Sequence, residues 1–374
     1  MVSLTTVTAQ NTAFLSTHPL VAVVVGGTSG ISEYAIRSLI TTHASLLSSS
    51  SSSPSSSPPS LRIYIIGRNA TAAQKTITDC KAICPGPEFE IIFVKAEDLS
   101  LLKDVDRVCE EIVKLEREKE GNGRGKARVD WLVMSQSNSV QSFNGRKLTS
   151  EGLDVQFSLH YYSRMRFVTQ LLPLLLNSTH PRGAHITSIY AAGMEATLHA
   201  NDLSLRQPTN YTFATVRSHV AYMTTLFFES LVQRHPGKLV ATHVFPGLVI
   251  TPGMYLAGYP FWFRVLRGVF GGLGVMRLVS MGSGEAGSRM VWTMAGEEFV
   301  CNGDGKVDGK GGQGIMAGTD GVKGGGAYAV GRLGDVIETE KAYKEVRKGD
   351  LKDRVWKYTW NAFEVIERGE VFED

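Results

Sequence analysis

The sequence predicts an α/β fold in which a doubly wound parallel sheet of the Rossmann type forms a single domain. Short apolar runs rich in β-branched residues alternate along the chain with longer stretches of helical periodicity. The runs are continuously apolar rather than alternating, which indicates a sheet covered by helices on both faces. Repeated strand–helix units with right-handed crossovers then place the strands parallel to one another.

The expected elements follow one another in regular order. Strands are expected at residues 20–25, 61–66, 89–94, 131–134, 184–188, 239–245 and 327–330. Helices are expected at residues 31–43, 72–83, 101–118, 152–175, 215–234, 284–295 and 355–366.

Composition narrows the class of protein. Hydrophobic residues make up 43% of the 374 residues and charged residues 20%, which is typical of a globular chain with a large core. The net charge of +3 gives no reason to expect a nucleic-acid or membrane-surface partner through bulk electrostatics. Too few cysteines are present for a disulfide framework, so we expect reduced thiols and a cytoplasmic location. They are Cys80, Cys84, Cys109 and Cys301.

Low-complexity tracts, rather than a second domain, explain the length of the chain. Within a domain of residues 20–300, residues 48–60 are ten serines and three prolines, and we expect a disordered surface loop. Residues 301–326 are expected to be a flexible glycine-rich linker, and residues 327–374 to complete the domain with a strand and a helix. Residues 1–19 form an N-terminal leader that lacks the features of a signal peptide.

A glycine-rich turn directly follows the first expected strand and directly precedes a helix. Such a turn lets the backbone approach a pyrophosphate, which the free N–H groups of the helix N-terminus then bind. The turn therefore predicts a dinucleotide site. The residues that we assign to the cofactor here are Gly26, Thr28, Ser29, Gly30 and Ile31.

The ends of the next two strands indicate which dinucleotide is bound. Arg68 and Asn69 follow the second strand, where an NAD site would carry a carboxylate for the ribose hydroxyls. An arginine suits the 2′-phosphate of NADP instead, so we expect NADP(H). Asp98 and Leu99 follow the third strand, where Asp98 would accept a hydrogen bond from the adenine amino group or cap the following helix.

These residues resemble those of the short-chain dehydrogenases/reductases. The likeness runs from residue 20 to residue 251, and includes residues 25–32, 151–154, 186–188 and 246–251. Residues 24–31 and 159–166 resemble a fungal branch of that family, whose members often act in secondary metabolism. The resemblance implies that Val249 and Thr251 face the nicotinamide amide and the phosphates, and that hydride transfer interconverts a ketone and an alcohol.

The chain departs from that family at the catalytic residues. The family relies on a Tyr-x-x-x-Lys pair, and none of the twelve tyrosines here has a lysine four residues later. Alignment places Thr215 at the tyrosine, His219 at the lysine and His160 at the family's asparagine, while Ser188 matches the family's serine.

Three interpretations of this altered site stay open. In the first, His219 or His160 donates the proton to an apolar ketone polarised by Ser188, with Thr215 lining the site and with Tyr190 and Tyr211 as further candidate donors. In the second, the protein is a non-redox lyase or isomerase. In the third, it binds NADP without catalysis.

The sequence says less about the substrate, the oligomeric state and membrane contacts than about the cofactor. A small-molecule substrate is expected, a homodimer or homotetramer is possible, and no metal site is expected. The apolar stretch 255–279 carries Arg264, Arg267 and Arg277 and is too interrupted to span a membrane. It is expected to be a substrate lid, a packed helix pair or a membrane-peripheral patch.

Overall fold

The computed structural model describes most of the 374 residues. The described ranges are residues 1–50, 59–86, 89–121, 125–138, 140, 145–255, 258–272, 275–302 and 314–373. Of the serine and proline tract, residues 51–58 lie outside the described residues, as do residues 303–313 of the glycine-rich tract.

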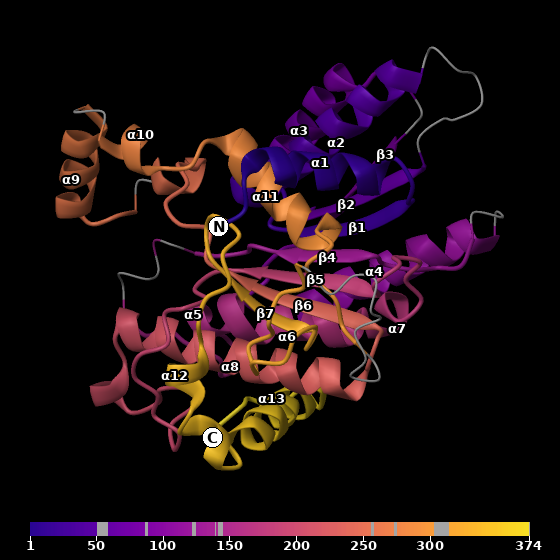
Figure 1. Cartoon of the computed structure of the whole chain (residues 1–374). Coiled ribbons are helices and arrows are strands. Elements are labelled where there is room, and N and C mark those ends of the chain that lie inside the picture. The colour runs from indigo at the N-terminus through magenta and orange to yellow at the C-terminus, as the bar shows by residue number, and fades with distance from the viewer. Residues whose placement is uncertain are drawn as a thin grey trace.

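A seven-stranded, fully parallel sheet forms the centre of the molecule (Figure 1), which confirms the predicted fold class. Its spatial order is β3-β2-β1-β4-β5-β6-β7. The strands are β1 (Leu20–Val25), β2 (Leu61–Gly67), β3 (Phe89–Lys95), β4 (Trp131–Met134), β5 (Ala184–Ile189), β6 (Leu239–Val244) and β7 (Ala327–Val330). The strand order reverses between β1 and β4, and ligands of such sheets bind outside the carboxyl ends of the strands at that point.

Helices cover both faces of the sheet (Figure 1). One face carries α1 (Leu4–Leu15), α2 (Ile31–Ser50), α3 (Ala70–Ile83) and α11 (Ser283–Ala295). The other carries α4 (Leu102–Gly121), α6 (Ser163–Gln170), α8 (Phe213–Arg234) and α13 (Leu351–Glu367). In β1, Ala22 and Val24 pack on the face that carries α2, while Val21 and Val23 pack on the face that carries α4. Both faces of the strand are therefore buried, which explains the unbroken apolar run.

Short helices complete the described chain. They are α5 (Val155–Phe157), the π-helical turn η2 (Ser158–Tyr162), α7 (Leu172–Leu175), η3 (Pro208–Asn210), η4 (Pro252–Tyr255), α9 (Phe261–Gly272), α10 (Val275–Val279), α12 (Glu340–Tyr343) and η5 (Val346–Lys348). The prediction of one continuous helix over residues 152–175 is therefore wrong, because the stretch is divided into α5, η2, α6 and α7.

Helix α2 and the N-terminal residues also differ from expectation. Helix α2 continues to Ser50 rather than ending at residue 43, so the first serines of the predicted loop are helical. The leader contains α1, which packs on α11 through the buried Phe14 and through a hydrogen bond of 2.9 Å from the Asn11 amide to the Ser288 carbonyl. The leader thus contributes a helix that packs against the helical layer on one face of the sheet.

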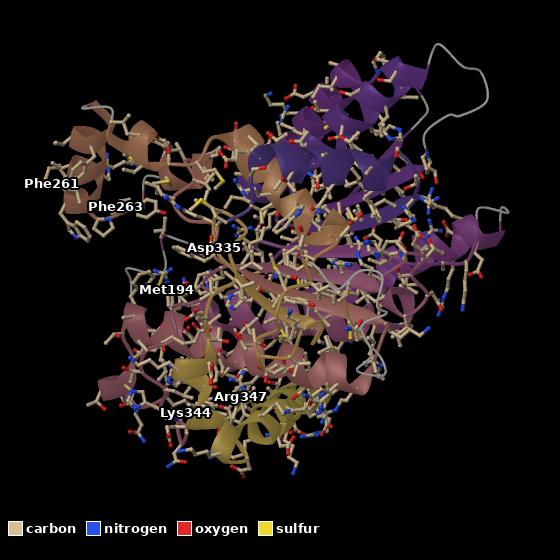
Figure 2. All side chains as sticks on the ribbon, viewed as in Figure 1. Met194, Phe261, Phe263, Asp335, Lys344 and Arg347 are labelled. Carbon is tan, nitrogen blue, oxygen red and sulfur yellow. The ribbon has the colours of Figure 1, made fainter. Side chains whose placement is uncertain are left out.

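The described end of the glycine-rich tract, residues 314–326, is anchored rather than extended. The Thr319 hydroxyl donates to the Glu229 carboxylate at 2.7 Å, and Arg347 pairs with the same carboxylate at 2.6 Å (Figure 2 labels Arg347). Glu229 is 3% exposed, so this ion pair ties the tract and the C-terminal segment to α8 from inside the molecule. The predicted strand at residues 327–330 is confirmed as β7.

No helix within the described residues is both long enough and apolar enough to span a bilayer.

Candidate active site

The glycine turn after β1 has a backbone that only glycine accommodates. Gly26 and Gly30 have φ angles of 79° and 72°, in the left-handed region. A Cβ atom on Gly26 would lie 2.9 Å from the Gln136 backbone nitrogen, so a side chain there has no room. The Gly26 N–H donates to the Ile66 carbonyl at 2.9 Å, and α2 begins at once with Ile31. The turn thus has the shape of a phosphate cradle.

Three further residues in and after the turn differ in their surroundings: Thr28, Ser29 and Ser32. Thr28 packs over the end of β2, where a Cβ on Gly67 would come within 2.5 Å of its methyl group. Ser29 is exposed. The hydroxyl of Ser32 is 2.6 Å from that of Ser135 after β4. This contact joins the turn to the neighbouring strand end.

The loop after β6 lies against the glycine turn. The Tyr34 hydroxyl on α2 donates to the Ile250 carbonyl at 3.1 Å. A Cβ on Gly30 would lie 3.3 Å from the Thr251 methyl group. Val249 is 6% exposed. Thr251 therefore lies beside the glycine turn, and the side chain of Val249 is buried.

Arg68 and Asn69 lie at the carboxyl end of β2, and both are exposed. Asn69 caps α3, because its side-chain oxygen accepts from the Ala72 N–H at 3.0 Å. Arg68 makes no hydrogen bond or ion pair with another described residue. Its guanidinium is thus available to an anion at the strand end.

Asp98 has a structural partner of its own. Its carboxylate accepts from the Ser100 N–H at 2.9 Å and from the Ser100 hydroxyl at 2.7 Å, which is the local capping role that the sequence left open. The side chain is exposed while Leu99 is 5% exposed. One oxygen of Asp98 is therefore occupied by the turn before α4.

Ser188, the residue that matches the family's serine, is hydrogen-bonded to an arginine that sequence reasoning did not select. Arg164 on α6 donates to the Ser188 hydroxyl at 2.9 Å and to the carbonyls of Ile189 and Gln136 at 2.9 and 3.0 Å. Arg164 and Ser188 are both fully buried, and burial lowers the pKa of Arg164. No described carboxylate pairs with Arg164, and hydroxyl and carbonyl oxygens accept its hydrogen bonds.

His160 occupies the π-helical turn Ser158–Tyr162. Such turns are rare and are often found at functional sites. The His160 Nδ1 lies 2.9 Å from the Gln156 carbonyl, so Nδ1 carries the proton and Nε2 is an acceptor. Burial, with a smaller effect of the Arg164 charge, lowers the pKa of His160 to about 3. With this pKa the His160 imidazole is neutral near pH 7, and its role as a proton donor stays a prediction.

Tyr190 joins His160, Arg164 and Ser188 in one cluster. Its ring stacks on His160 with centroids 4.0 Å apart, and the guanidinium carbons of Arg164 and Arg217 each lie 5.8 Å from its centroid. Burial raises the pKa of Tyr190 to about 12, while both arginines act in the opposite direction. With this pKa the phenol is protonated near pH 7. Its hydroxyl makes no hydrogen bond with a described residue, so it is free to donate one.

The side chains of His219 and Thr215, which the sequence assigned to the site, both make hydrogen bonds within the fold. The His219 Nε2 accepts from the His199 N–H at 2.9 Å, and its Nδ1 lies 3.2 Å from the Leu203 carbonyl. Both ring nitrogens are therefore used, the ring is fully buried, and burial lowers the pKa of His219 to about 4. The Thr215 hydroxyl donates to the Asn210 carbonyl at 2.7 Å and belongs to the capping box of α8.

Tyr211, the other candidate donor, is engaged elsewhere. Its hydroxyl lies 3.2 Å from both carboxylate oxygens of Asp154, which caps α5. Burial and the Asp154 charge raise the pKa of Tyr211. The proton is thus committed to a structural hydrogen bond, which distinguishes Tyr211 from Tyr190.

Sequence reasoning did not select Arg164 or Arg217 as site residues, because neither aligns with a catalytic position of the family. The available signal was weak: Arg164 interrupts the apolar face of the predicted helix 152–175, and Arg217 follows Thr215 by two residues. Only the fold shows that α6 and α8 bring these cations to the end of β5.

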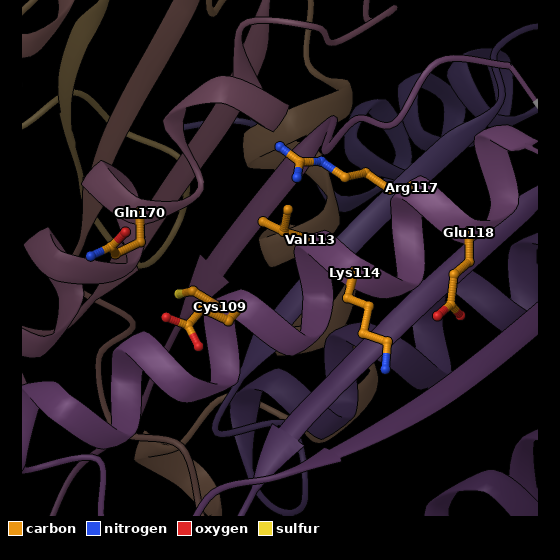
Figure 3. Close-up of a pocket in the computed structure, with 7 residues that line it drawn as sticks. Cys109, Val113, Lys114, Arg117, Glu118 and Gln170 are labelled. Carbon is orange, nitrogen blue, oxygen red and sulfur yellow. The ribbon is translucent and has the colours of Figure 1, made fainter.

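Two further features lie outside this cluster. A surface pocket of about 540 Å³ lies over α4, with Gln170 contributed by α6 (Figure 3). It is lined by Cys109, Glu110, Val113, Lys114, Arg117, Glu118 and Gln170 and contains none of the predicted site residues. Within the described ranges, no group of three or more His, Cys, Asp or Glu side chains could hold a metal ion.

The sheet order and the glycine turn define a Rossmann-type α/β protein. The short-chain dehydrogenase/reductase SAT2 of Stachybotrys chartarum is 36% identical over 350 residues, which cover 91% of this chain and 90% of the relative. The NmrA-like family domain-containing oxidoreductase notO of an Aspergillus species is 32% identical over 368 residues, or 97% and 95% of the two chains. The chain therefore belongs to the short-chain dehydrogenase/reductase family.

Solved structures agree on the fold. The reductase/Diels-Alderase MalC of Malbranchea aurantiaca superposes with a TM-score of 0.50 at 16% identity, covering 78% of this chain and 95% of that one. No protein-family model matches the sequence.

Proposed function

We propose that the protein is an NADP(H)-dependent oxidoreductase that interconverts a ketone and an alcohol on an apolar small molecule in fungal secondary metabolism. The observation that carries the chemical part is the position of Tyr190, a free and protonated phenol two residues beyond Ser188 and in contact with His160. The curated relatives, which are fungal oxidoreductases, support the reaction class.

The residues at the carboxyl edge fit the cofactor. The cradle at Gly26, which a Cβ would fill, suits a pyrophosphate, and Thr251 lies beside it. Arg68 offers a guanidinium to a 2′-phosphate at the end of β2, where its charge has no other described partner. When bound, the nicotinamide supplies or accepts the hydride.

Side chains of the protein would bind the carbonyl oxygen of the substrate and supply its proton. Because Arg164 donates to the Ser188 oxygen, the serine proton is left free to donate to a carbonyl. Tyr190 is partly exposed while Ser188 is fully buried, so Tyr190 is the better placed to reach a substrate oxygen and to give it a proton. The cations of Arg164 and Arg217 favour the phenolate that remains. Arg164 is a positioning residue in this scheme.

A ketone screen tests this function. The protein is incubated with NADPH and a panel of aromatic and alicyclic ketones, and the absorbance of the reduced nicotinamide is followed together with product formation. The proposal expects equal consumption of NADPH and formation of alcohol. Product without NADPH consumption would show a non-redox lyase or isomerase, and tight NADPH binding without any turnover would show a non-catalytic NADP-binding protein.

A further inference from the structure

Helix α9 (Phe261–Gly272) stands away from the body of the protein and buries none of its residues. Figures 1 and 2 show it at the outer end of a projection formed with α10, and Figure 2 labels Phe261 and Phe263 on it. Phe261 is 79% exposed and Trp262 58%, and Leu278 on α10 is 85% exposed. The predicted packed helix pair is therefore not supported, since α9 and α10 contact each other but α9 is not covered by the domain.

The apolar side chains of α9 form one continuous face. At helical spacing, Phe261, Val265 and Val269 make one row, and Trp262, Leu266 and Phe270 make the adjacent row. All six are between 41% and 79% exposed. Contiguous apolar surface of this kind in a soluble domain marks a site of interaction.

The opposite face of α9 is turned toward the protein. Arg267 on that face donates a hydrogen bond to the Met254 carbonyl, and its guanidinium carbon lies 4.7 Å from the centroid of the Tyr255 ring. These contacts hold the polar face of the helix on the loop that follows β6. The apolar face consequently points away from that loop, which does not fit a lid closed over the site.

Charge identifies the occupant of the apolar face. No aspartate or glutamate occurs between Glu229 and Glu285, whereas the stretch contains Arg264, Arg267 and Arg277. A second copy of the chain would bring the same arginines together at a two-fold interface without an acidic partner from this stretch. An anionic surface of lipid headgroups complements the arginines, and aromatic side chains of the Trp262 and Phe261 type favour the boundary beneath the headgroups.

We propose that α9 docks the protein on an anionic lipid surface. The apolar face enters the boundary between headgroups and acyl chains, while Arg264 at the flank of that face lies among the headgroups. This proposal does not rest on the proposed enzymatic function, because it uses none of the residues at the carboxyl edge of the sheet.

Vesicle binding tests the proposal with the full chain. Vesicles of phosphatidylcholine alone are compared with vesicles of equal parts phosphatidylcholine and phosphatidylserine by co-sedimentation. We expect the anionic vesicles to bind the protein at least about tenfold more strongly, and we expect added salt to weaken binding. Trp262 emission should shift to shorter wavelength on binding. Trp262 is the most exposed of the five tryptophans, since Trp131 and Trp292 are buried and the two on α13 are partly buried.

Variants make the test specific. The double substitution Phe261→Asp/Val269→Asp should reduce binding to anionic vesicles at least about tenfold, because it places two charges on the apolar face. Val371→Asp, at another exposed apolar residue (54%), should bind as the wild type does. Trp262→Phe should keep the binding but lose the emission shift. Thermal unfolding and NADPH affinity are measured on each variant to separate this result from any failure of the fold or of the enzymatic proposal.

Two outcomes would overturn the proposal. One is that the wild type sediments with neither kind of vesicle. The other is a concentration-dependent dimer that the Phe261→Asp/Val269→Asp substitution abolishes, which would assign the apolar face to a second copy of the chain.

Discussion

A guanidinium nitrogen of Arg164 donates to the Ser188 hydroxyl over 2.9 Å in a region where neither side chain has exposed surface. The same guanidinium donates to the carbonyls of Ile189 and Gln136, at the ends of two adjacent strands. The arginine therefore joins β4, β5 and α6 directly beneath the proposed site, and fixes the direction in which the serine hydroxyl can donate.

Removing Arg164 should destabilise the protein. Arg164→Leu would leave two buried carbonyls without a donor, and we expect a loss of roughly 3 kcal/mol in the free energy of unfolding, measured by urea denaturation. Arg217→Leu is the matched control, since Arg217 has no hydrogen bond to a described residue, and it should cost less than about 1 kcal/mol. Equal losses in the two variants would contradict the assigned role of Arg164.

Tyr190→Phe should lower turnover by about 100-fold in the reduction of a ketone found in the screen, because it removes the proton donor but keeps the ring on His160. Tyr211→Phe should change turnover less than about threefold, because the Tyr211 hydroxyl is bonded to Asp154. Steady-state rates on folded protein check this pair. Full activity in Tyr190→Phe would remove Tyr190 from the mechanism.

His219→Ala should affect stability rather than turnover. The imidazole bonds the backbone at His199 and Leu203, so its loss should cost about 2 kcal/mol in the free energy of unfolding. Turnover per folded molecule should stay within about threefold of the wild type. A variant of wild-type stability with turnover reduced about 100-fold would restore His219 as a catalytic residue.

The buried histidines should make the protein sensitive to mild acid. The folded-state pKa of His219 is about 4 and that of His160 about 3, both below the unfolded value of about 6.5. Below pH ~6.5 the unfolded state therefore binds more protons, and the stabilising effect of each neutral histidine, complete above that pH, falls as pH drops toward its folded pKa. Urea denaturation between pH 7 and pH 5 should show a shallower loss of stability in His219→Gln. An unchanged slope in that variant would contradict the burial effect.

The sequence predicted the fold closely, since each strand reads as an apolar run and the helices keep their period. The Ser188 cluster was harder to foresee. His219 aligned with a lysine in the family, but its ring became buried against the loop at residues 199–203, and only the fold reveals that both its nitrogens are used. Conversely, Arg164 lies 24 residues before Ser188, and no local pattern links them.

For helix α9, the sequence revealed the residues but not their arrangement. Its apolar and cationic residues were evident in the sequence, but three arrangements were compatible with them. The contacts of Arg267 with Met254 and Tyr255 determine which face of α9 points outward.

Titration of the protein with NADPH and with NADH by calorimetry tests the central claim most directly. We predict that NADPH binds at least about tenfold more tightly, and that Arg68→Ser removes this preference while Arg117→Ser, an exposed arginine on α4, keeps it. Equal affinity for the two cofactors in the wild type, or binding of neither by the folded protein, would contradict the account.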